Sequence, residues 1–323
     1  MAGVKEAAAT GGAQAASLDH QLVAFGVMVA FFLIAPFFMY PVFLMKVLCF
    51  ALFACAFNLL VGYVGLLSFG HAAFMGMAGY VCGHAVKVWG FPPELSLLVA
   101  TAAAALLGLL FGVLAIRRQG IYFAMITLAL AQMVYFFCLQ AKFTGGEDGI
   151  QAIPRGRLLA LVDLNQMLPI YFVVLAIFLF GFLLIYRTIH SPFGQVLKAI
   201  RENEPRAISL GYRVDQYKLI AFVLSAALSG LAGATKAIVF QLAALTDVHW
   251  SMSGEVVLMT LVGGLGTVFG PVVGAFIIIA MENYLAELGS WVLVTQGVVF
   301  VACVLAFRRG IVGELARLVK KPL

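Results

Sequence analysis

Long uncharged hydrophobic runs alternate with short polar connections along this chain. A membrane-spanning helix needs about 20 apolar residues, and most of the runs without Asp, Glu, Lys or Arg reach that length. They are residues 21–45, 47–86, 95–116, 119–141, 164–186, 219–235, 256–281 and 288–307. The run at 47–86 is long enough for two passes. The pattern predicts an all-α, polytopic helical bundle over residues 21–307, with about 8–10 spans.

Glycine clusters interrupt two of these runs. The first lies within residues 62–80, and the second is GGLGTVFGP at 263–271. Because glycine destabilises a continuous helix, we expect a short helix from about Ser253 to Val262, a break, and a helix from about Pro271 to Leu285. GLLSFG (65–70) and GLGTVFG (264–270) are weakly alike. Paired breaks in the two halves of a chain indicate an internally repeated transporter.

Positive charge concentrates in residues 187–218 and in the tail 308–323. The first segment holds six Lys or Arg and three acidic residues, so the positive-inside rule places it in the cytoplasm as a loop. Counting passes backwards puts Arg117 and Arg118 inside, residues 142–163 outside, and a disordered segment 1–20 inside. The basic tail also belongs inside, which requires an even number of passes after Lys218. Counting 253–286 as one pass gives three passes, an odd number. This conflict is a second reason to expect a broken element there.

The 187–218 loop has the pattern of two short helices. Ser191 can cap the first and Pro192 suits its first position, and Gly211 can close the second, from Glu204 to Leu210, in the left-handed conformation. An apolar stripe on the first helix is formed by Phe193, Val196, Leu197 and Ile200. A solvated loop is the alternative, but the stripe needs a membrane surface or a partner protein to pack on.

Composition excludes a soluble enzyme. Of 323 residues 64% are hydrophobic and only 11% charged, with a net charge of +6, whereas soluble domains are about 45–50% apolar. The five cysteines lie in apolar runs without a CxxC pair, and we find no catalytic or metal-ligand motif. The spans lack carboxylates, which argues against an ion-coupled carrier. The chain also lacks a phosphate-binding loop, so energy for transport would come from another subunit, received at residues 192–211.

Polar side chains within the spans are candidates for a substrate path. His71 follows Ser68 and Gly70 at the first break, and Thr127 and Gln132 lie within the 119–141 run. A packed histidine and hydrogen bonding between helices are the alternative interpretations. In the connection at 236–255, Lys236 could pair with Asp247 or with Glu255.

Six blocks of sequence, in order, resemble the LivM-type permease subunits of branched-chain amino acid ABC importers. The blocks are GLLSFGHAAFMGMAGY (65–80), RRQGIYFAMITLALAQM (117–133), TGGEDGI (144–150), SPFGQVLKAIRENEPRAISLGY (191–212), YKLIAFVLSAALSGLAGA (217–234) and SGEVVLMTLVGGLGTVFGPVVGA (253–275). The resemblance implies a complex with a second homologous permease, two ATPase subunits and a periplasmic substrate-binding protein. ATP and Mg would bind to the ATPase subunits, and this chain would bind no cofactor. It also implies a bacterial inner membrane.

The resemblance also assigns residues to roles. The ATPase-coupling segment maps onto Gly194 to Gly211, with candidates Gly194, Arg201, Glu202, Glu204, Arg206, Ala207 and Gly211, although Pro205 and Arg206 interrupt the usual motif. Path candidates are Ser68, Gly70, His71, Thr127, Gln132, Gly264 and Thr267. The solute is a branched-chain amino acid, or alternatively urea, a short amide or an aromatic acid. A stand-alone secondary carrier or channel and a membrane-embedded enzyme are the competing classes.

Overall fold

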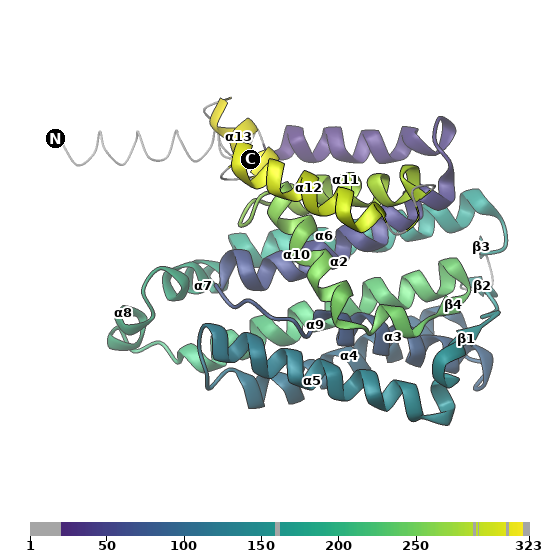
Figure 1. The fold of residues 1–323 in the computed structure, drawn as a ribbon, viewed down its shortest axis with the longest axis horizontal. Helices are drawn as coiled ribbons and strands as arrows, with labels where there is room; N and C mark the ends of the chain where they lie inside the picture. Colours follow the sequence, from purple (N-terminus) through teal and green to yellow (C-terminus); the bar gives the residue numbers. More distant parts are fainter. Residues whose placement is uncertain (1–20, 159–161, 287–288, 290, 308–309, 319–323) are drawn as a thin grey trace.

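The computed structural model describes residues 21–158, 162–286, 289, 291–307 and 310–318, so the disorder expected for residues 1–20 lies outside the described residues. The described chain is almost entirely helical (Figure 1). Its helices are an unlabelled first helix Gln21–Phe37, which ends in the 3₁₀ turn η1 (Ala35–Phe37), then α2 Pro41–Tyr63, α3 His71–Lys87, α4 Pro93–Ala115, α5 Ile121–Gln140, α6 Met167–His190, α7 Pro192–Glu202, α8 Glu204–Ser209, α9 Val214–Phe240, α10 Trp250–Gly263, α11 Gly270–Tyr284, α12 Trp291–Ala306 and α13 Gly310–Leu318.

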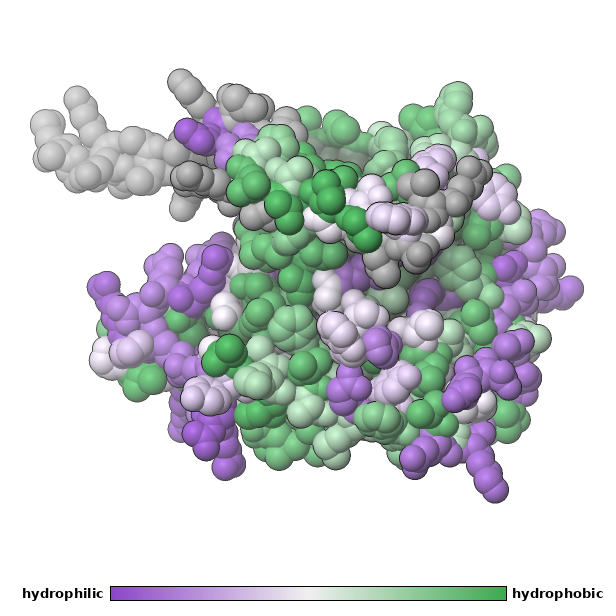
Figure 2. All heavy atoms as spheres, viewed as in Figure 1, coloured by the Kyte–Doolittle hydropathy of each residue, from purple (hydrophilic) through white to green (hydrophobic). Residues whose placement is uncertain are grey.

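The bundle has the polarity of a multi-pass membrane protein. Within the described residues five helices, namely α2, α4, α5, α6 and α9, are long and apolar enough to cross a bilayer, and three shorter apolar helices accompany them. Hydrophilic residues gather mainly at the two ends of the molecule, with hydrophobic side chains covering most of the length between them (Figure 2). We call the end that carries α7 and α8 the inner end, and the end that carries the short strands the outer end.

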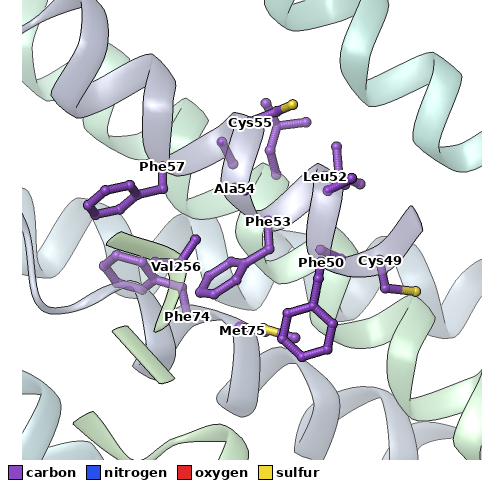
Figure 3. Packing of buried hydrophobic residues seen from close by; sticks show 14 of the residues in the cluster. Cys49, Phe50, Leu52, Phe53, Ala54, Cys55, Phe57, Phe74, Met75 and Val256 are labelled. Atoms are coloured by element: carbon purple, nitrogen blue, oxygen red, sulfur yellow. The ribbon is translucent and has the colours of Figure 1, made fainter. Parts of the chain in front are cut away.

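Helix α2 is the centre of the bundle and is buried over most of its length. Its phenylalanines Phe53 and Phe57 point toward Phe74 of α3 and Val256 of α10 (Figure 3). Aromatic side chains bury large apolar areas and favour edge-to-face contacts. The absence of any polar face on α2 follows from this position, because its neighbours surround it on all sides.

Two short helices, α3 and α10, begin inside the bundle (Figure 1). Helix α2 runs from the outer to the inner end, residues 64–70 return to mid-depth, and α3 continues to the outer end. Helix α9 runs the opposite way, residues 241–249 return to mid-depth, and α10 continues to the inner end. The two halves are therefore arranged with inverted topology. The likeness of residues 65–70 to 264–270 stays a prediction, but the segment of the second half that returns to mid-depth is 241–249, not 264–270.

The structure also corrects the predicted spans. The first run breaks at residues 38–40, so Lys46 lies within α2, where its ammonium group is 2.8 Å from the carboxylate of Glu282 on α11. The break after α10 occurs as expected, and the two helices that it separates, α10 and α11, are antiparallel. This resolves the parity conflict, because the number of passes from α9 onward is now even: α9, residues 241–249 together with α10, α11 and α12. The predicted basic tail is helical at α13, which begins against Gly264 at the inner end.

Short strands close the outer end. Strand β1 (Ile150–Gln151) pairs antiparallel with β4 (Leu242–Ala243), and β2 (Arg157–Leu158) pairs with β3 (Val162–Asp163). The 3₁₀ turns η2 (Lys142–Thr144), η3 (Gly146–Asp148) and η4 (Leu245–Asp247) complete this end. The β1–β4 pair joins the long outer loop to the return segment 241–249, so that α10 starts from a fixed position.

Candidate functional site

The inner-end helices α7 and α8 form a helical hairpin with the predicted caps. The Ser191 hydroxyl accepts a hydrogen bond from the Gly194 amide at 3.3 Å, and Pro192 occupies the first turn. The side-chain oxygen of Asn203 caps α8 by accepting from the Arg206 amide at 3.1 Å. Gly211 follows α8 with φ +89°, a left-handed conformation that glycine adopts without a steric penalty.

The apolar stripe of α7 packs against this chain's own helices, and not against a membrane surface or a partner protein as predicted. Leu197 and Ile200 are buried, and Ile200 forms a small cluster with Ala207 and Val214. Gly194 contacts the end of α6 so closely that a β-carbon there would lie 2.3 Å from the Ile189 carbonyl oxygen. Two of the coupling candidates, Gly194 and Ala207, therefore fix the hairpin on the bundle.

Ionic contacts tie the hairpin to α9 and α2. The Glu204 carboxylate lies 2.7 Å from the Lys218 ammonium group, whose side chain is only 3% exposed. The Arg201 guanidinium donates a hydrogen bond to the carbonyl oxygen of Gly62, at the end of α2. Glu202 and Arg206 are exposed. The hairpin is thus linked to α9 by an ion pair and to α2 by a hydrogen bond, in addition to its contact with α6.

An apolar tip projects from the hairpin beyond the predicted candidates. We define the apolar tip as Ile208, Leu210 and Tyr212, which are 57%, 69% and 40% exposed. Their hydrophobic exposure beside charged side chains is typical of a surface that a partner covers. The sequence contains a signal for the tip, since these residues lie at or beside Gly211 and outside the apolar stripe of α7.

At the inner end, Gly264 and Thr267 lie in the turn between α10 and α11. The side chain of Asn58 on α2 donates to the Thr267 carbonyl at 2.8 Å and accepts from the Gly266 amide at 3.0 Å. The Thr267 hydroxyl donates to the Gly264 carbonyl at 2.8 Å. These two path candidates hold a turn beside Arg201. Asn58, which sequence reasoning missed, stands out only as an isolated amide in the apolar run of α2.

Four other path candidates, Ser68, Gly70, His71 and Thr127, meet in a buried polar junction at mid-depth. The Thr127 hydroxyl accepts from the Phe69 amide at 3.1 Å and donates to the Ala124 carbonyl at 2.9 Å. The Ser68 hydroxyl accepts a hydrogen bond from the Gly70 amide at 3.1 Å. Across the junction, the Ser253 hydroxyl of α10 accepts from the Ala72 amide at 3.0 Å and donates to the Phe69 carbonyl at 2.8 Å. The starts of α3 and α10 are thereby joined.

His71 is fully buried in this junction. Its ring has edge-to-face contacts with Phe57, Phe74 and Phe222, at centroid distances of 5.0, 5.7 and 6.3 Å. Its Nε2 lies 2.8 Å from the Ser225 hydroxyl, which is itself 2.6 Å from the Ala56 carbonyl. Since that hydroxyl has one proton and the carbonyl only accepts, Nε2 donates in this arrangement. The environment matches the packed-histidine alternative.

Gln132 lies on α5, the helix whose Tyr135 contacts the start of α10. Tyr135 is one turn further along α5, so the two side chains share a face, and its ring lies 5.3 Å from that of His249. His249 Nδ1 is 2.8 Å from the Ser251 hydroxyl. Trp250 is 49% exposed. We define the mid-depth polar surface as Gln132, Tyr135, His249, Trp250 and Ser251.

The return segment 241–249 is held by an ion pair. Sequence left Asp247 and Glu255 open as partners of Lys236, and the structure pairs Lys236 with Asp247. The Lys236 ammonium group also lies over the Phe50 ring, 5.3 Å from its centroid. The pair is largely buried, so it fixes the segment from which α10 starts. Among the described residues, the side chains form no cluster suited to a metal ion.

Comparison with known proteins places these features in context. The family described as branched-chain amino acid transport system / permease component matches residues 39–307. The high-affinity branched-chain amino acid transport system permease protein LivM of Escherichia coli (strain K12) is 26% identical over 263 residues, which cover 74% of this chain and 62% of that protein. The ribose import permease protein RbsC of Bacillus subtilis (strain 168) is 30% identical over 196 residues, which cover 56% of this chain and 58% of that protein.

A third relative is the probable branched-chain amino acid transport permease protein LivH of Methanocaldococcus jannaschii, 30% identical over 117 residues, or 35% of this chain and 34% of that protein. The chain thus spans less than two thirds of the length of these curated relatives. No solved structure matches it.

Proposed function

Because this chain belongs to the family of permease components of branched-chain amino acid transport systems, we propose that it is one of two permease subunits of an ATP-driven importer. Two ATPase subunits bind ATP and Mg at its inner end, and a substrate-binding protein delivers solute at its outer end. The inner end faces the cytoplasm of a bacterial cell. The observation that carries the proposal is the hairpin α7–α8, a rigid projection with the exposed apolar tip.

A mechanical connection leads from the hairpin to the middle of the bundle. Arg201 of α7 is bonded to Gly62 of α2, and Asn58 of α2 is bonded to the turn after α10. At its other end α10 carries the mid-depth polar surface. Movement of the hairpin as a rigid body would therefore move α10 along its length, which is the kind of rocking that alternating access requires.

The mid-depth polar surface is our candidate for the substrate path within this subunit. It retains Gln132 from the sequence candidates and adds His249 and Ser251. The buried junction of Ser68, Gly70, His71 and Thr127 positions α3 and α10, and Gly264 and Thr267 position the inner turn. A polar surface on an otherwise apolar face at mid-depth is costly in lipid, so we expect the second permease to cover it.

A branched-chain amino acid is the solute we propose, in keeping with the family and with LivM of E. coli. Deleting the gene for this chain should abolish uptake of labelled leucine, isoleucine and valine. The same chain, isolated in gentle detergent, should bring with it two ATPases and a second permease. If the deletion leaves leucine uptake intact but abolishes uptake of ribose, urea or an aromatic acid, that compound is the solute in place of a branched-chain amino acid. Isolation of the chain alone from transporting membranes would favour a stand-alone carrier.

The apolar tip provides a direct test of coupling. Leu210→Asp places a charge on the exposed tip, so we expect loss of ATPase co-purification and at least a tenfold fall in uptake, since burying an unpaired charge in an interface costs more than about 1.4 kcal/mol. Gln216→Asp is the matched control, because it adds the same charge to an exposed position of the same end. Equal effects of both variants, or of neither, would contradict the role of the tip.

The mid-depth polar surface is tested by Gln132→Leu and Ser251→Ala. We expect normal amounts of assembled complex and a higher KM or lower rate of uptake, because these side chains contact solute without supporting the core. Thr101→Val is the control, since the Thr101 hydroxyl bonds to its own helix at the Leu97 carbonyl. Unchanged uptake in both surface variants would remove this surface from the path.

A further inference from the structure

Two cavities adjoin at the inner end of the bundle. The first, of about 510 Å³, is polar and lies between α7, the end of α2 and the turn at 264–269. The second, of about 480 Å³, lies between the first helix, α11 and α13. Their linings are adjacent along the chain. Gln21 and Val268 line the first cavity, while Ala24, one turn further along the first helix, and Phe269, the residue after Val268, line the second.

The polar cavity contains two cationic groups without carboxylate partners. Lys198 and Arg201 both line it, and neither forms an ion pair within the part of the chain that the structure describes. The Lys198 ammonium group lies over the Tyr63 ring, 5.7 Å from its centroid. Glu202 also lines the cavity. With His190 neutral, the two cations and this one carboxylate give the cavity a net charge of one positive unit. Such a cavity favours a singly charged anion.

The second cavity is an apolar groove. All of its lining residues are hydrophobic, among them Val27, Phe31, Phe276 and Val312. Val27 and Phe31 are 64% and 46% exposed, so the groove opens sideways from the bundle. Two of the three helices that form it, the first helix and α11, are apolar helices of the membrane region. A groove of this kind at membrane depth suits a hydrocarbon chain.

We propose that the two cavities together bind one anionic phospholipid of the inner leaflet. Its phosphate lies between Lys198 and Arg201, and one acyl chain lies in the groove along Val27 and Phe276. The lining changes from cationic in the first cavity to wholly apolar in the second between Val268 and Phe269. A phospholipid changes in the same order, from an anionic head group to a hydrocarbon chain. Basic pockets between helices on the cytoplasmic side are suited to anionic head groups. The bound lipid would connect α7 to the first helix and to the turn at 264–269.

Lipid retention measures this directly. The complex is placed in nanodiscs of phosphatidylcholine with a minor fraction of phosphatidylglycerol, and native mass spectrometry counts the lipids that remain bound. We expect phosphatidylglycerol to be enriched over its bulk fraction. Lys198→Gln should lower that enrichment about fivefold, the contribution of one basic residue near the membrane surface. Arg213→Gln, which removes an equal charge from an exposed position outside the cavity, should leave it unchanged.

The groove is tested separately from the charge. Val27→Trp fills the groove without altering any charge and should reduce retention, whereas Val23→Trp, at a similarly exposed position of the same helix, should not. Both positions are exposed, so neither variant disturbs the core. Glu202→Gln removes the one acidic group of the cavity and should increase retention.

Several outcomes would overturn the assignment. Equal losses in Lys198→Gln and Arg213→Gln would mean a diffuse electrostatic attraction. Displacement of the lipid by inorganic phosphate, with no effect of Val27→Trp, would indicate a site for free anions. If the protein retains phosphatidylethanolamine in preference to phosphatidylglycerol, and Glu202→Gln abolishes this preference, the ligand is a zwitterionic lipid. Loss of the second permease in Val27→Trp, with lipid retained, would assign the groove to a protein interface.

Discussion

At the scale of single residues, isolated polar side chains decide how the broken helices meet. Asn58 and Ser253 each bond to backbone groups of another segment, at the inner turn and at the mid-depth junction. Within a bilayer such backbone groups cannot turn to water, so a side chain must satisfy them. This explains why a chain that is 11% charged keeps uncharged amides and hydroxyls at its helix breaks.

His71 is a residue for which packing and transport predict different results. His71→Ala should destabilise the protein by about 3 kcal/mol, because it leaves a cavity among three phenylalanines. His71→Phe should cost less, since it keeps the volume and Ser225 keeps its bond to Ala56. Thermal unfolding in detergent gives both values. A normal unfolding temperature in His71→Ala with uptake abolished would return His71 to the substrate path.

At the scale of elements, the return segments 64–70 and 241–249 determine where α3 and α10 begin. Residues 64–70 are joined to α5 by Thr127 and to α10 by Ser253. Residues 241–249 are joined to the outer loop by β4 and to α9 by the Lys236–Asp247 ion pair. Neither segment contains an α-helix, and part of the backbone of each is hydrogen-bonded to another element of the bundle.

The Lys236–Asp247 pair can be tested with a double-mutant cycle. Lys236→Met should cost about 3 kcal/mol of unfolding free energy, because it leaves a largely buried carboxylate without its partner. Adding Asp247→Asn should recover much of that loss, because the neutral side chain needs no counter-charge. Additive losses in the double variant would show that the two groups do not interact.

At the scale of the whole molecule, the inverted arrangement places the two ends of α10 in different functional regions. One end lies beside the hairpin through Arg201 and the 264–269 turn, and the other carries the mid-depth polar surface. The corresponding helix of the first half, α3, runs to the outer end and packs beneath the outer loop, where Ile153 contacts Gly83. Helix α10 thus runs from mid-depth to the inner end, and α3 runs from mid-depth to the outer end in the opposite direction.

This arrangement predicts a labelling pattern. In a Cys303→Ser background, single cysteines at Ser209 of α8 and Arg317 of α13 should react with an impermeant thiol reagent from the same side of the membrane. A cysteine at Glu147 should react from the other side. The four remaining native cysteines are buried and should stay silent. Labelling of the Ser209 and Arg317 variants from opposite sides would contradict the antiparallel placement of α10 and α11.

Much of the fold followed from local pattern. The helical hairpin with its Ser191 cap and Gly211 was predicted closely, as were the breaks near 64–70 and 264–269. The candidate path residues were less well predicted, because a polar residue in an apolar run has the same appearance whether it packs or lines a surface. Ser68, His71 and Thr127 proved fully buried, while His249 and Ser251 were hidden in what looked like an outer connection.

The membrane class, the helical content, the hairpin and the family could be predicted from the sequence, because hydrophobic length, capping residues and ordered motifs are properties of short segments. The direction of α10 relative to α11 and the long-range contacts could be read only from the fold. Lys46 meets Glu282, and Asn58 meets the turn after α10, across more than two hundred residues, where backbone satisfaction in lipid and close packing of buried aromatics select one arrangement.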